Sequence, residues 1–479
     1  MTTIRRIGTA LLALCMTAVL PGCSGSSSSQ ADPPAPAAES TAQQTETTAA
    51  ESAPATETAA SKPAITVHTN AENGTLSHAG YTLEQVVVLS RHNIRSPLSS
   101  KDSILGQATP HEWFAWSSAP SELSLRGGAA ETVMGQYFRK WMEQENLFPE
   151  NYRPAENEVR FYANSKQRTI ATANYFKAGL LPAADLPVEY HMKFDEMDPV
   201  FTPRLNFISD AYSAAVKEQV KSIFTDKIND LSDNYDLISD LIDLRQSPAY
   251  SDGTLTGFLT DDTQLVLELE KEPAMKGSLK TACSISDALV LQYYEEPDDA
   301  KAAFGRSMTF DDWKKVSEIK DLYGDVLFTA PLVAPNTAHM LLEEMQKELT
   351  TAGRKFTFLC GHDSNVGSVL AALGVKEYAL PETIESKTPI GCKLVFSKWR
   401  DAGGKAFVSC DMVYQSSAQL RDLSLLDLEH APVIYSMRFD GLEKNADGLY
   451  DAKDITDRFA SAIAAYDTLQ SEYTLDAAA

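Results

Sequence analysis

A run of apolar residues that ends in a polar cluster is the clearest pattern in the chain. Residues 86–89 are apolar and mostly β-branched, which predicts a strand buried on both of its faces. The chain continues as Arg91-His92-Asn93-Ile94-Arg95-Ser96-Pro97, and Pro97 prevents regular structure from continuing. Two guanidinium groups around an imidazole can bind a phosphate or a carboxylate. A solvated basic turn at the surface is the alternative interpretation.

The same pattern occurs at two later strands, each of which ends in polar residues ahead of a helix. Residues 159–163 predict a short strand, followed by Asn164-Ser165-Lys166-Gln167-Arg168 and a helix. Residues 356–360 predict another, followed by Gly361-His362-Asp363-Ser364-Asn365 and a helix over 366–373. Each cluster alone has an ordinary explanation, as a solvated turn or a helix cap. Open α/β sheets place ligands at the carboxyl ends of their strands, so together the three clusters predict one site.

Helical spacing of apolar residues predicts most of the remaining elements. Apolar residues recur every three or four positions over 128–145, 311–322 and 338–349. The mostly hydrophobic hairpin over 393–414 should extend the sheet as antiparallel strands. Residues 205–301 show helical spacing throughout, which predicts a helical insertion. We therefore expect an α/β fold, a three-layer sandwich with a mostly parallel central sheet, plus a mainly helical cap subdomain.

The length of the chain fits such a two-part fold. It has 479 residues, of which 43% are hydrophobic, enough for a full core. The predicted boundaries place the α/β domain at 64–204 and 302–479 and the cap subdomain at 205–301. The formal net charge of −24 excludes nucleic acid as an expected partner, because binding DNA or RNA needs a basic face. A phosphate site here would be a local positive pocket in a negative field.

The N-terminal residues predict export from the cytoplasm. Two arginines precede an apolar run that is short for a membrane span, so residues 1–22 are interpreted as a signal peptide. The run ends in Leu20-Pro21-Gly22-Cys23, which resembles the lipobox of bacterial lipoproteins, whose cysteine is lipidated. Residues 23–63 lack large apolar side chains and predict a disordered tether. We expect an extracytoplasmic, cell-surface lipoprotein that contacts the membrane only through Cys23; an unlipidated secreted or periplasmic protein is the alternative.

The cysteines give no metal-binding pattern. No Cys-x-x-Cys or Cys/His cluster with zinc spacing occurs, and no dinucleotide or P-loop glycine pattern follows a predicted strand. We therefore expect neither a metal nor a cofactor. Cys392 and Cys410 flank the predicted hairpin, and equal arms would place them nearly opposite each other. A disulfide fits a secreted protein, and two buried free thiols are the alternative.

The residues at the three strand ends suit phosphoryl transfer. The guanidinium groups of Arg91, Arg95 and Arg168 can neutralise the equatorial oxygens of a phosphoryl group. A neutral histidine nitrogen is a competent nucleophile toward phosphorus. An adjacent carboxylic acid can protonate the leaving alcohol and then take a proton from water. Because the ordinary pKa of aspartic acid is about 3.9, such a donor indicates acidic working conditions unless its site raises that value.

The same residues resemble a known family. The segment 91–97 resembles the Arg-His-Gly-x-Arg-x-Pro signature of the histidine acid phosphatases, and His362-Asp363 and Leu123-Ser124-x-x-Gly127 resemble two further motifs of that family. Asn93 stands where most members have Gly, and the same Asn occurs in the periplasmic glucose-1-phosphatase branch. The likeness runs in order from about 83 to 420. Further stretches similar to that branch are Thr109-Pro110-His111-Glu112-Trp113, Tyr162-Ala163-Asn164-Ser165-Lys166-Gln167-Arg168-Thr169, Met197-Asp198-Pro199-x-Phe201-x-Pro203, Leu291-Gln292-Tyr293-Tyr294-Glu295 and Thr388-Pro389-Ile390-Gly391.

The resemblance implies a role for each residue. His92 would be the phosphorylated nucleophile, and Asp363 would be the proton donor. Glu295 matches an acidic residue on the sugar side of the pocket in that branch, with a helix-end carboxylate facing water as the alternative. Asn93 would hydrogen-bond the turn or contact the substrate. The residues expected to bind the phosphoryl group are Arg91, Arg95, Arg168 and His362.

The expected function follows from this resemblance. It implies a secreted acid phosphatase that hydrolyses sugar phosphates such as glucose 1-phosphate through a covalent phosphohistidine. The expected partner is a small phosphorylated sugar or an inositol phosphate. One alternative is a phytase of the same family, acting on inositol hexakisphosphate. Another is a lipoprotein that binds phosphorylated sugars without hydrolysing them.

Overall fold

The structure, a computed structural model, describes residues 74–98 and 103–475, which belong to the unit His68–Ala479. The predicted signal peptide at 1–22, Cys23 and the predicted tether at 23–63 lie outside the described residues. Within the described part of the chain, no helix is long and apolar enough to cross a membrane.

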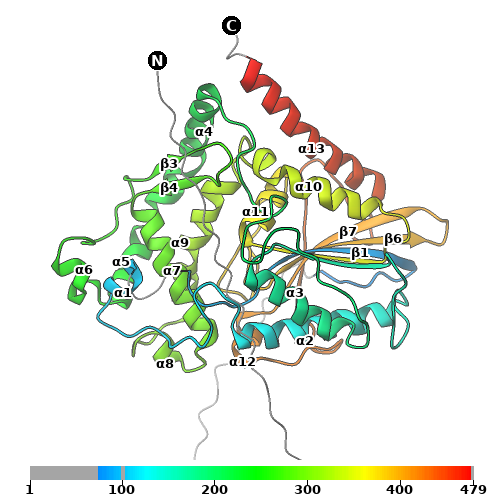
Figure 1. Ribbon diagram of the computed structural model, residues 1–479, viewed down its shortest axis with the longest axis horizontal. Coiled ribbons are helices and arrows are strands. Elements are labelled where there is room, and N and C mark those ends of the chain that lie inside the picture. The colour runs from blue at the N-terminus through cyan, green and yellow to red at the C-terminus, as the bar shows by residue number, and fades with distance from the viewer. Residues whose placement is uncertain (1–73, 99–102, 476–479) are drawn as a thin grey trace, which may run out of the picture. The chain divides into compact units, whose positions relative to one another are not determined.

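A mixed β-sheet forms the centre of this unit (Figure 1). Its strands are β1 (Tyr81–Arg91), β2 (Val159–Ala163), β5 (Phe356–Gly361), β6 (Lys393–Asp401), β7 (Ala406–Tyr414), β8 (Val433–Ser436) and β9 (Tyr450–Asp451). Strands β2, β5 and β1 are parallel neighbours. The sheet continues from β1 through β6, β7 and β8 in antiparallel pairings, and β9 pairs with β7. The hairpin predicted over 393–414 therefore extends the sheet as expected.

Helices cover both faces of the sheet, which confirms the expected α/β class and its three layers (Figure 1). They are α2 (Leu125–Gln144) and α3 (Gln167–Leu180) on one face, and α10 (Ala334–Thr350), α11 (Asp363–Ala372) and α13 (Ala452–Leu475) on the other. Val86 and Val88 of β1 share a core with α2 and α3, whereas Leu89 shares one with α10 and α11. Val86 to Leu89 are fully buried, as the apolar run predicts for a strand between two helical layers.

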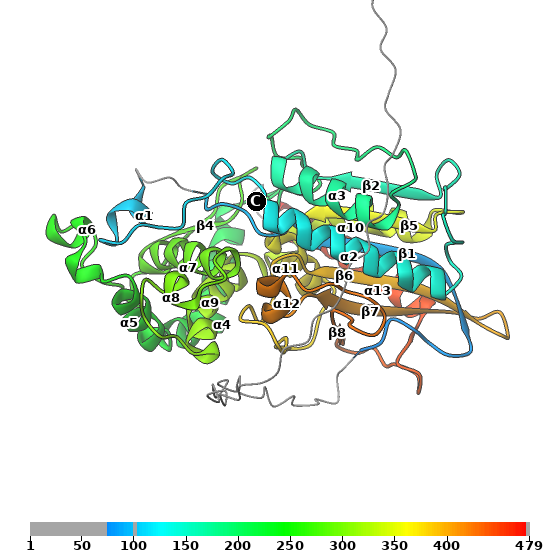
Figure 2. The same ribbon diagram turned by 90° about the horizontal axis from the view of Figure 1, so that it is seen from below.

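A mainly helical region lies beside these layers (Figure 1 and Figure 2). Its elements are α1 (Ile104–Gln107), α4 (Asp210–Asn229), α5 (Ser232–Leu241), α6 (Pro248–Ser251), β3 (Gln264–Val266), β4 (Ala274–Lys276), α7 (Ser278–Glu295), α8 (Asp299–Ala302) and α9 (Phe310–Phe328). Residues of α4, α5, α7 and α9 form one buried core, including Tyr212, Ile238, Ile285 and Val316. One face of each of these helices packs against the others. Such packing places apolar residues at helical spacing, which is why the sequence pattern predicted that this region is mainly helical.

The hairpin of β6 and β7 corrects the expectation about the cysteines. Arg400 pairs with Ala406, so Cys410 lies opposite Phe396, four residues from Cys392. Four strand residues span about 13 Å, and a disulfide needs Cα atoms within about 7 Å of each other. Both cysteines are buried free thiols, which is the alternative that the sequence left open. The turn between β6 and β7 sets which residues of the two strands pair, and this pairing keeps the two cysteines apart.

Candidate active site

The register of the sheet brings three strand ends together. Arg91 at the end of β1 pairs with Gly361 at the end of β5. Ala163 at the end of β2 pairs with the preceding residue of β5. The N–H of His92 donates to the Gly361 carbonyl (3.0 Å), and the rings of His92 and His362 lie 5.5 Å apart between centroids. The polar residues that follow these strands therefore meet at one edge of the sheet.

His92 is held in the tautomer that a nucleophile needs. Its Nδ1 lies 2.9 Å from the carbonyl oxygen of Asn93. A carbonyl oxygen only accepts, so Nδ1 carries the proton and the lone pair of Nε2 is free. Burial, followed by the charge of Arg168, lowers the pKa of His92 well below its ordinary value. The imidazole therefore stays neutral in acidic solution, with Nε2 available for attack.

His362 is held in the complementary tautomer, as a donor from Nδ1. The side-chain oxygen of Asn164 accepts the N–H of Asp198 (2.9 Å), which turns the Asn164 amide nitrogen toward His362 Nε2 (2.7 Å). Nε2 therefore accepts a hydrogen bond and Nδ1 carries the proton. Nδ1 lies 3.4 Å from Nη2 of Arg168, and both residues line the same pocket. Their N–H groups can thus donate to oxygens of one bound anion.

Three guanidinium groups surround His92 and have unused donors. Within the described residues, the buried Nε of Arg91, Arg95 and Arg168 each lacks a hydrogen-bond partner. Buried donors without a partner are rare in proteins. Three of them around one histidine fit a site for an anion rich in acceptor oxygens, such as a phosphoryl group.

Carboxylates fix two of these guanidinium groups in place. Glu385 is fully buried and accepts a hydrogen bond from Nη1 of Arg91 (2.7 Å). It also pairs with Nζ of Lys320 (2.9 Å). Asp287 on α7 pairs with Nη2 of Arg95 (3.0 Å). Charge-assisted contacts of this kind orient the guanidinium groups before any substrate binds.

Asp363 is the first residue of α11 and faces the same pocket. Its side chain is 43% exposed, and its Oδ2 lies 3.3 Å from Nη2 of Arg91. Partial desolvation in the pocket by itself raises the pKa of this carboxyl, but the charges of Arg91 and Lys320 outweigh it and hold the pKa well below its ordinary value. Asp363 is therefore ionised in the free protein. A phosphate anion beside it has the opposite effect and favours the protonated acid.

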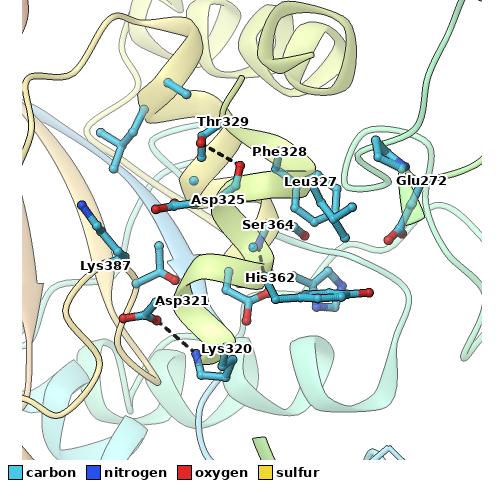
Figure 3. A pocket seen from close by; sticks show the side chains of 18 of the residues that line it. Glu272, Lys320, Asp321, Asp325, Leu327, Phe328, Thr329, His362, Ser364 and Lys387 are labelled. Atoms are coloured by element: carbon cyan, nitrogen blue, oxygen red, sulfur yellow. Dashed lines mark hydrogen bonds and ion pairs between the residues drawn. The ribbon is translucent and has the colours of Figure 1, made fainter. Parts of the chain in front are cut away.

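His92, Arg95, Arg168, His362 and Asp363 line a pocket of about 1040 Å³ between the strand ends and helices α7 and α9, whereas Arg91 is 1% exposed and does not line it. Figure 3 shows Lys320 and Asp321, joined by an ion pair (3.5 Å), to one side of His362, and Glu272 to the other. The pocket thus places carboxylates close to its cluster of cations.

The two residues expected to influence specificity do not line this pocket. Asn93 is 1% exposed; its Nδ2 donates to Oε1 of Glu131 on α2 (2.9 Å), and its Oδ1 accepts the N–H of Ile94 (2.8 Å). Glu295 accepts a hydrogen bond from the Ser124 hydroxyl (2.7 Å) at the N-terminus of α2. Burial raises the pKa of Glu295. That Glu295 shapes the sugar side of the pocket stays a prediction.

Several residues with defined positions in the site were missed by the sequence analysis. Most are single polar residues in stretches that otherwise predict a helix or a loop, and no motif marks them. Lys393 did give a signal, because a charge directly before the apolar run 394–396 of a buried sheet requires a buried partner. Glu131 of α2 is that partner (2.7 Å). The others are Glu272, Asp287, Lys320 and Glu385; Asn164 lay in the second polar cluster but had no role assigned to it.

No group of three or more His, Cys, Asp and Glu side chains in the described part of the chain is arranged to hold a metal ion. That the protein needs neither metal nor cofactor stays a prediction. The positive charge at the pocket comes from its own arginine and lysine side chains.

Comparisons with known proteins identify the family of the chain. A family model of the histidine phosphatase superfamily (branch 2) matches residues 82–412. The chain is 36% identical over 374 residues to a glucose-1-phosphatase of Salmonella typhimurium, a match that covers 77% of this chain and 90% of that protein. A glucose-1-phosphatase of Providencia rettgeri is 36% identical over 366 residues, covering 75% and 86%. The solved structure of Hafnia alvei phytase in complex with myo-inositol hexakis sulphate is similar with a TM-score of 0.73 and 26% identity, covering 81% of this chain and 98% of that one.

Proposed function

The chain belongs to the histidine phosphatase superfamily, branch 2, and we propose that it hydrolyses sugar phosphates of the glucose 1-phosphate type through a covalent phosphohistidine. The observation that carries this proposal is the unprotonated Nε2 of His92 in a pocket that Arg95, Arg168 and Asp363 also line. Nucleophile, anion-binding groups and acid therefore share one space.

In the first half-reaction, Nε2 of His92 attacks phosphorus, and the bond from phosphorus to the ester oxygen breaks. The three guanidinium groups and Nδ1–H of His362 bind the non-bridging oxygens and stabilise their charge. The leaving oxygen takes the proton of the Asp363 carboxylic acid, so the sugar departs as a neutral alcohol. The products are a phosphorylated Nε2 and an Asp363 carboxylate.

In the second half-reaction, the Asp363 carboxylate takes a proton from water. The water oxygen attacks phosphorus and the phosphorus–nitrogen bond breaks, which returns the lone pair to Nε2 of His92. Asp363 then holds the proton, as it did in the substrate complex, and it loses this proton when inorganic phosphate leaves, so both groups return to their state in the free protein.

The carboxylates of the pocket support a sugar as the leaving group. Glu272, Asp287 and Asp321 line the pocket. Carboxylates accept hydrogen bonds from hydroxyl groups, which a sugar offers, and repel additional phosphate groups. The two similar proteins named glucose-1-phosphatase favour the same substrate class.

A phytase is the second candidate, and a different observation favours it. Lys280, Lys376 and Lys387 also line the pocket, and lysines can bind the further phosphates of an inositol phosphate. The Hafnia alvei phytase structure holds an inositol hexakis sulphate, a polyanion of this kind.

Release of phosphate from glucose 1-phosphate and from inositol hexakisphosphate across acidic pH tests the proposal. We expect the higher kcat/KM for glucose 1-phosphate, and a loss of at least ~10³-fold in kcat for His92→Ala because the nucleophile is gone. A higher kcat/KM for inositol hexakisphosphate would support the phytase. Binding of both compounds without release of phosphate would support a phosphosugar-binding lipoprotein, a function that needs neither nucleophile nor acid.

We also propose that the protein is exported and held at the membrane by a lipid on Cys23. The sequence supports this through the two arginines and apolar run before the lipobox-like segment and through the polar tether after it. All of these residues lie outside the described part of the chain.

A further inference from the structure

A buried ion pair lies next to the turn that carries the nucleophile. Lys393 of β6 and Glu131 of α2 are both fully buried, and their Nζ and Oε1 atoms lie 2.7 Å apart. The strand register pairs Lys393 with Ser90, two residues before His92. Neither half-reaction described above uses this pair.

Two hydrogen bonds connect the pair to the imidazole. Oε1 of Glu131 accepts Nδ2–H of Asn93 (2.9 Å) as well as the lysine. The backbone carbonyl of Asn93 accepts Nδ1–H of His92 (2.9 Å). This carbonyl is the group that places the proton of His92 on Nδ1 and leaves Nε2 free.

Asn93 is also fixed by its other polar groups. Its backbone N–H donates to Oγ1 of Thr172 (3.2 Å), and its Oδ1 accepts the N–H of Ile94 (2.8 Å). The orientation of the Asn93 carbonyl therefore depends on bonds made at both ends of this residue. Loss of the bond to Glu131 removes the partner of its side-chain nitrogen.

The hydrogen bonds of Lys393 also lead to the backbone of His92. Nζ of Lys393 donates to the carbonyl of Gly391 (2.6 Å), and the N–H of Gly391 donates to the carbonyl of His92 (3.2 Å). Gly391 has a φ of +70°, and a Cβ there would lie 2.4 Å from Nδ2 of Asn93 and 3.2 Å from Oε1 of Glu131. Glycine is thus required by both the backbone and the space that the Asn93 amide occupies. We call Asn93, Glu131, Gly391 and Lys393 the turn brace.

Stability does not explain a charged pair at this position. Taking two charges out of water costs several kcal/mol per ion, and apolar residues of similar volume often replace such pairs without loss of stability. Oε2 of Glu131 is buried without a hydrogen-bond partner in the described part of the chain, which adds to the cost. The bond to the nucleophile's turn supplies a different reason for the pair.

We propose that Glu131 is a positioning residue for phosphoryl transfer, which through the Asn93 amide keeps the proton of His92 on Nδ1 and Nε2 directed into the pocket, and that Lys393 neutralises the buried charge of Glu131. This inference rests on the proposed function, because it concerns the orientation of the histidine that acts as nucleophile in that function. It assigns Asn93 to the nucleophile's turn and not to contact with the substrate.

Two double variants of the full-length protein test the turn brace. E131L/K393M removes both charges and the acceptor for Asn93, while E131Q/K393M removes both charges but keeps an amide oxygen there. Changing both partners avoids a lone buried charge. We expect E131L/K393M to lower kcat for glucose 1-phosphate ~10- to 100-fold, because small misplacements of reacting groups have effects of that order. We expect E131Q/K393M to stay within about threefold of the unmodified protein.

Inhibition by inorganic phosphate distinguishes a misplaced His92 imidazole from general damage to the active site. It depends on the guanidinium groups, so we expect it to change by less than about twofold in both variants. A folded E131L/K393M with unchanged kcat would overturn the inference, as would a parallel loss of kcat and phosphate inhibition, or an equal loss of kcat in both variants.

If E131L/K393M does not fold, the variant Asn93→Ala provides the test instead. It removes the amide and leaves the ion pair intact, so the same loss of kcat with normal phosphate inhibition is expected, and full activity overturns the inference. Absence of phosphate release by the unmodified protein from every phosphomonoester would overturn the proposed function instead. The two failures are therefore distinguishable.

Discussion

At the scale of single residues, His92 and Asp363 respond to the same surroundings in opposite ways. Burial and nearby positive charge both disfavour a protonated imidazole, so they act together in lowering the pKa of His92. For Asp363, burial and positive charge oppose each other, and the charge of Arg91 prevails. In the free protein His92 is therefore neutral, with its Nε2 unprotonated, and Asp363 is ionised. We infer that the phosphate group of the substrate, by its own negative charge, favours the protonated form of Asp363.

Asp363→Asn tests the role of this carboxyl as proton donor. A sugar alkoxide is a poor leaving group and needs a proton, whereas an activated aryl oxide does not. We expect the variant to lose ~10²- to 10⁴-fold in kcat for glucose 1-phosphate and much less for an activated aryl phosphate. Steady-state kinetics with both substrates provide the measurement. An equal loss on both would contradict the donor role.

The dependence of kcat on pH follows from the same assignment. Only the protonated carboxyl donates, so raising the pH through the pKa that Asp363 has in the enzyme–substrate complex removes the active form and lowers kcat for glucose 1-phosphate. The lowered pKa of His92 means that its protonation limits kcat/KM only at a pH below the ordinary range of histidine. We expect Asp363→Asn to flatten the decline toward neutral pH. A decline that persists unchanged in this variant would assign it to another group.

At the scale of elements, α2 and α3 approach each other so closely that their contact requires glycine. A Cβ on Gly135 would lie 2.2 Å from the carbonyl oxygen of Phe176, and one on Gly179 would lie 2.1 Å from that of Thr132. Both obstructing atoms belong to helix backbone, which cannot move aside as a side chain can. The same two helices carry Glu131 of the turn brace and Arg168 of the site, so their spacing also positions the chemistry.

Gly135→Ala and Gly324→Ala form a matched pair of helix substitutions that tests this contact. We expect Gly135→Ala to lower the free energy of unfolding by about 1–3 kcal/mol, because the new methyl group meets backbone. Gly324 of α9 has no atom within 4 Å of an added Cβ, so Gly324→Ala should gain up to about 1 kcal/mol from helix propensity. Urea denaturation measures both changes. Equal effects would mean that the α2–α3 contact is looser than described.

At the scale of the whole molecule, local pattern predicted the layers and the meeting of three strand ends. A strand buried on both faces and a helix buried on one each leave a periodic trace in the sequence. Pairings between distant elements leave no such trace. Glu131 and Lys393 are 262 positions apart, and the hairpin register that separates Cys392 from Cys410 depends on its turn. The supporting charges around the pocket were therefore missed, whereas the motifs did mark the arginines, the histidines and Asp363 that meet at the strand ends.

Attachment to the membrane is a property of the whole molecule that the N-terminal sequence predicts. Cys23→Ser removes the thiol that a lipid would occupy but leaves the apolar run before it intact. We expect the unmodified protein in the membrane fraction and the variant in the soluble extracytoplasmic fraction, with equal phosphatase activity. Cell fractionation with the activity assay measures both. The same distribution for both proteins would contradict lipidation at Cys23.

Transfer of a phosphoryl group to His92 during turnover is the central claim, and trapping that group tests it most directly. Asp363→Asn protein mixed with a radiolabelled aryl phosphate and quenched in alkali, where phosphohistidine survives, should carry label on the peptide that contains His92. The variant that also carries His92→Ala should carry none. Label on another residue, or release of phosphate by His92→Ala at the unmodified rate, would contradict the mechanism.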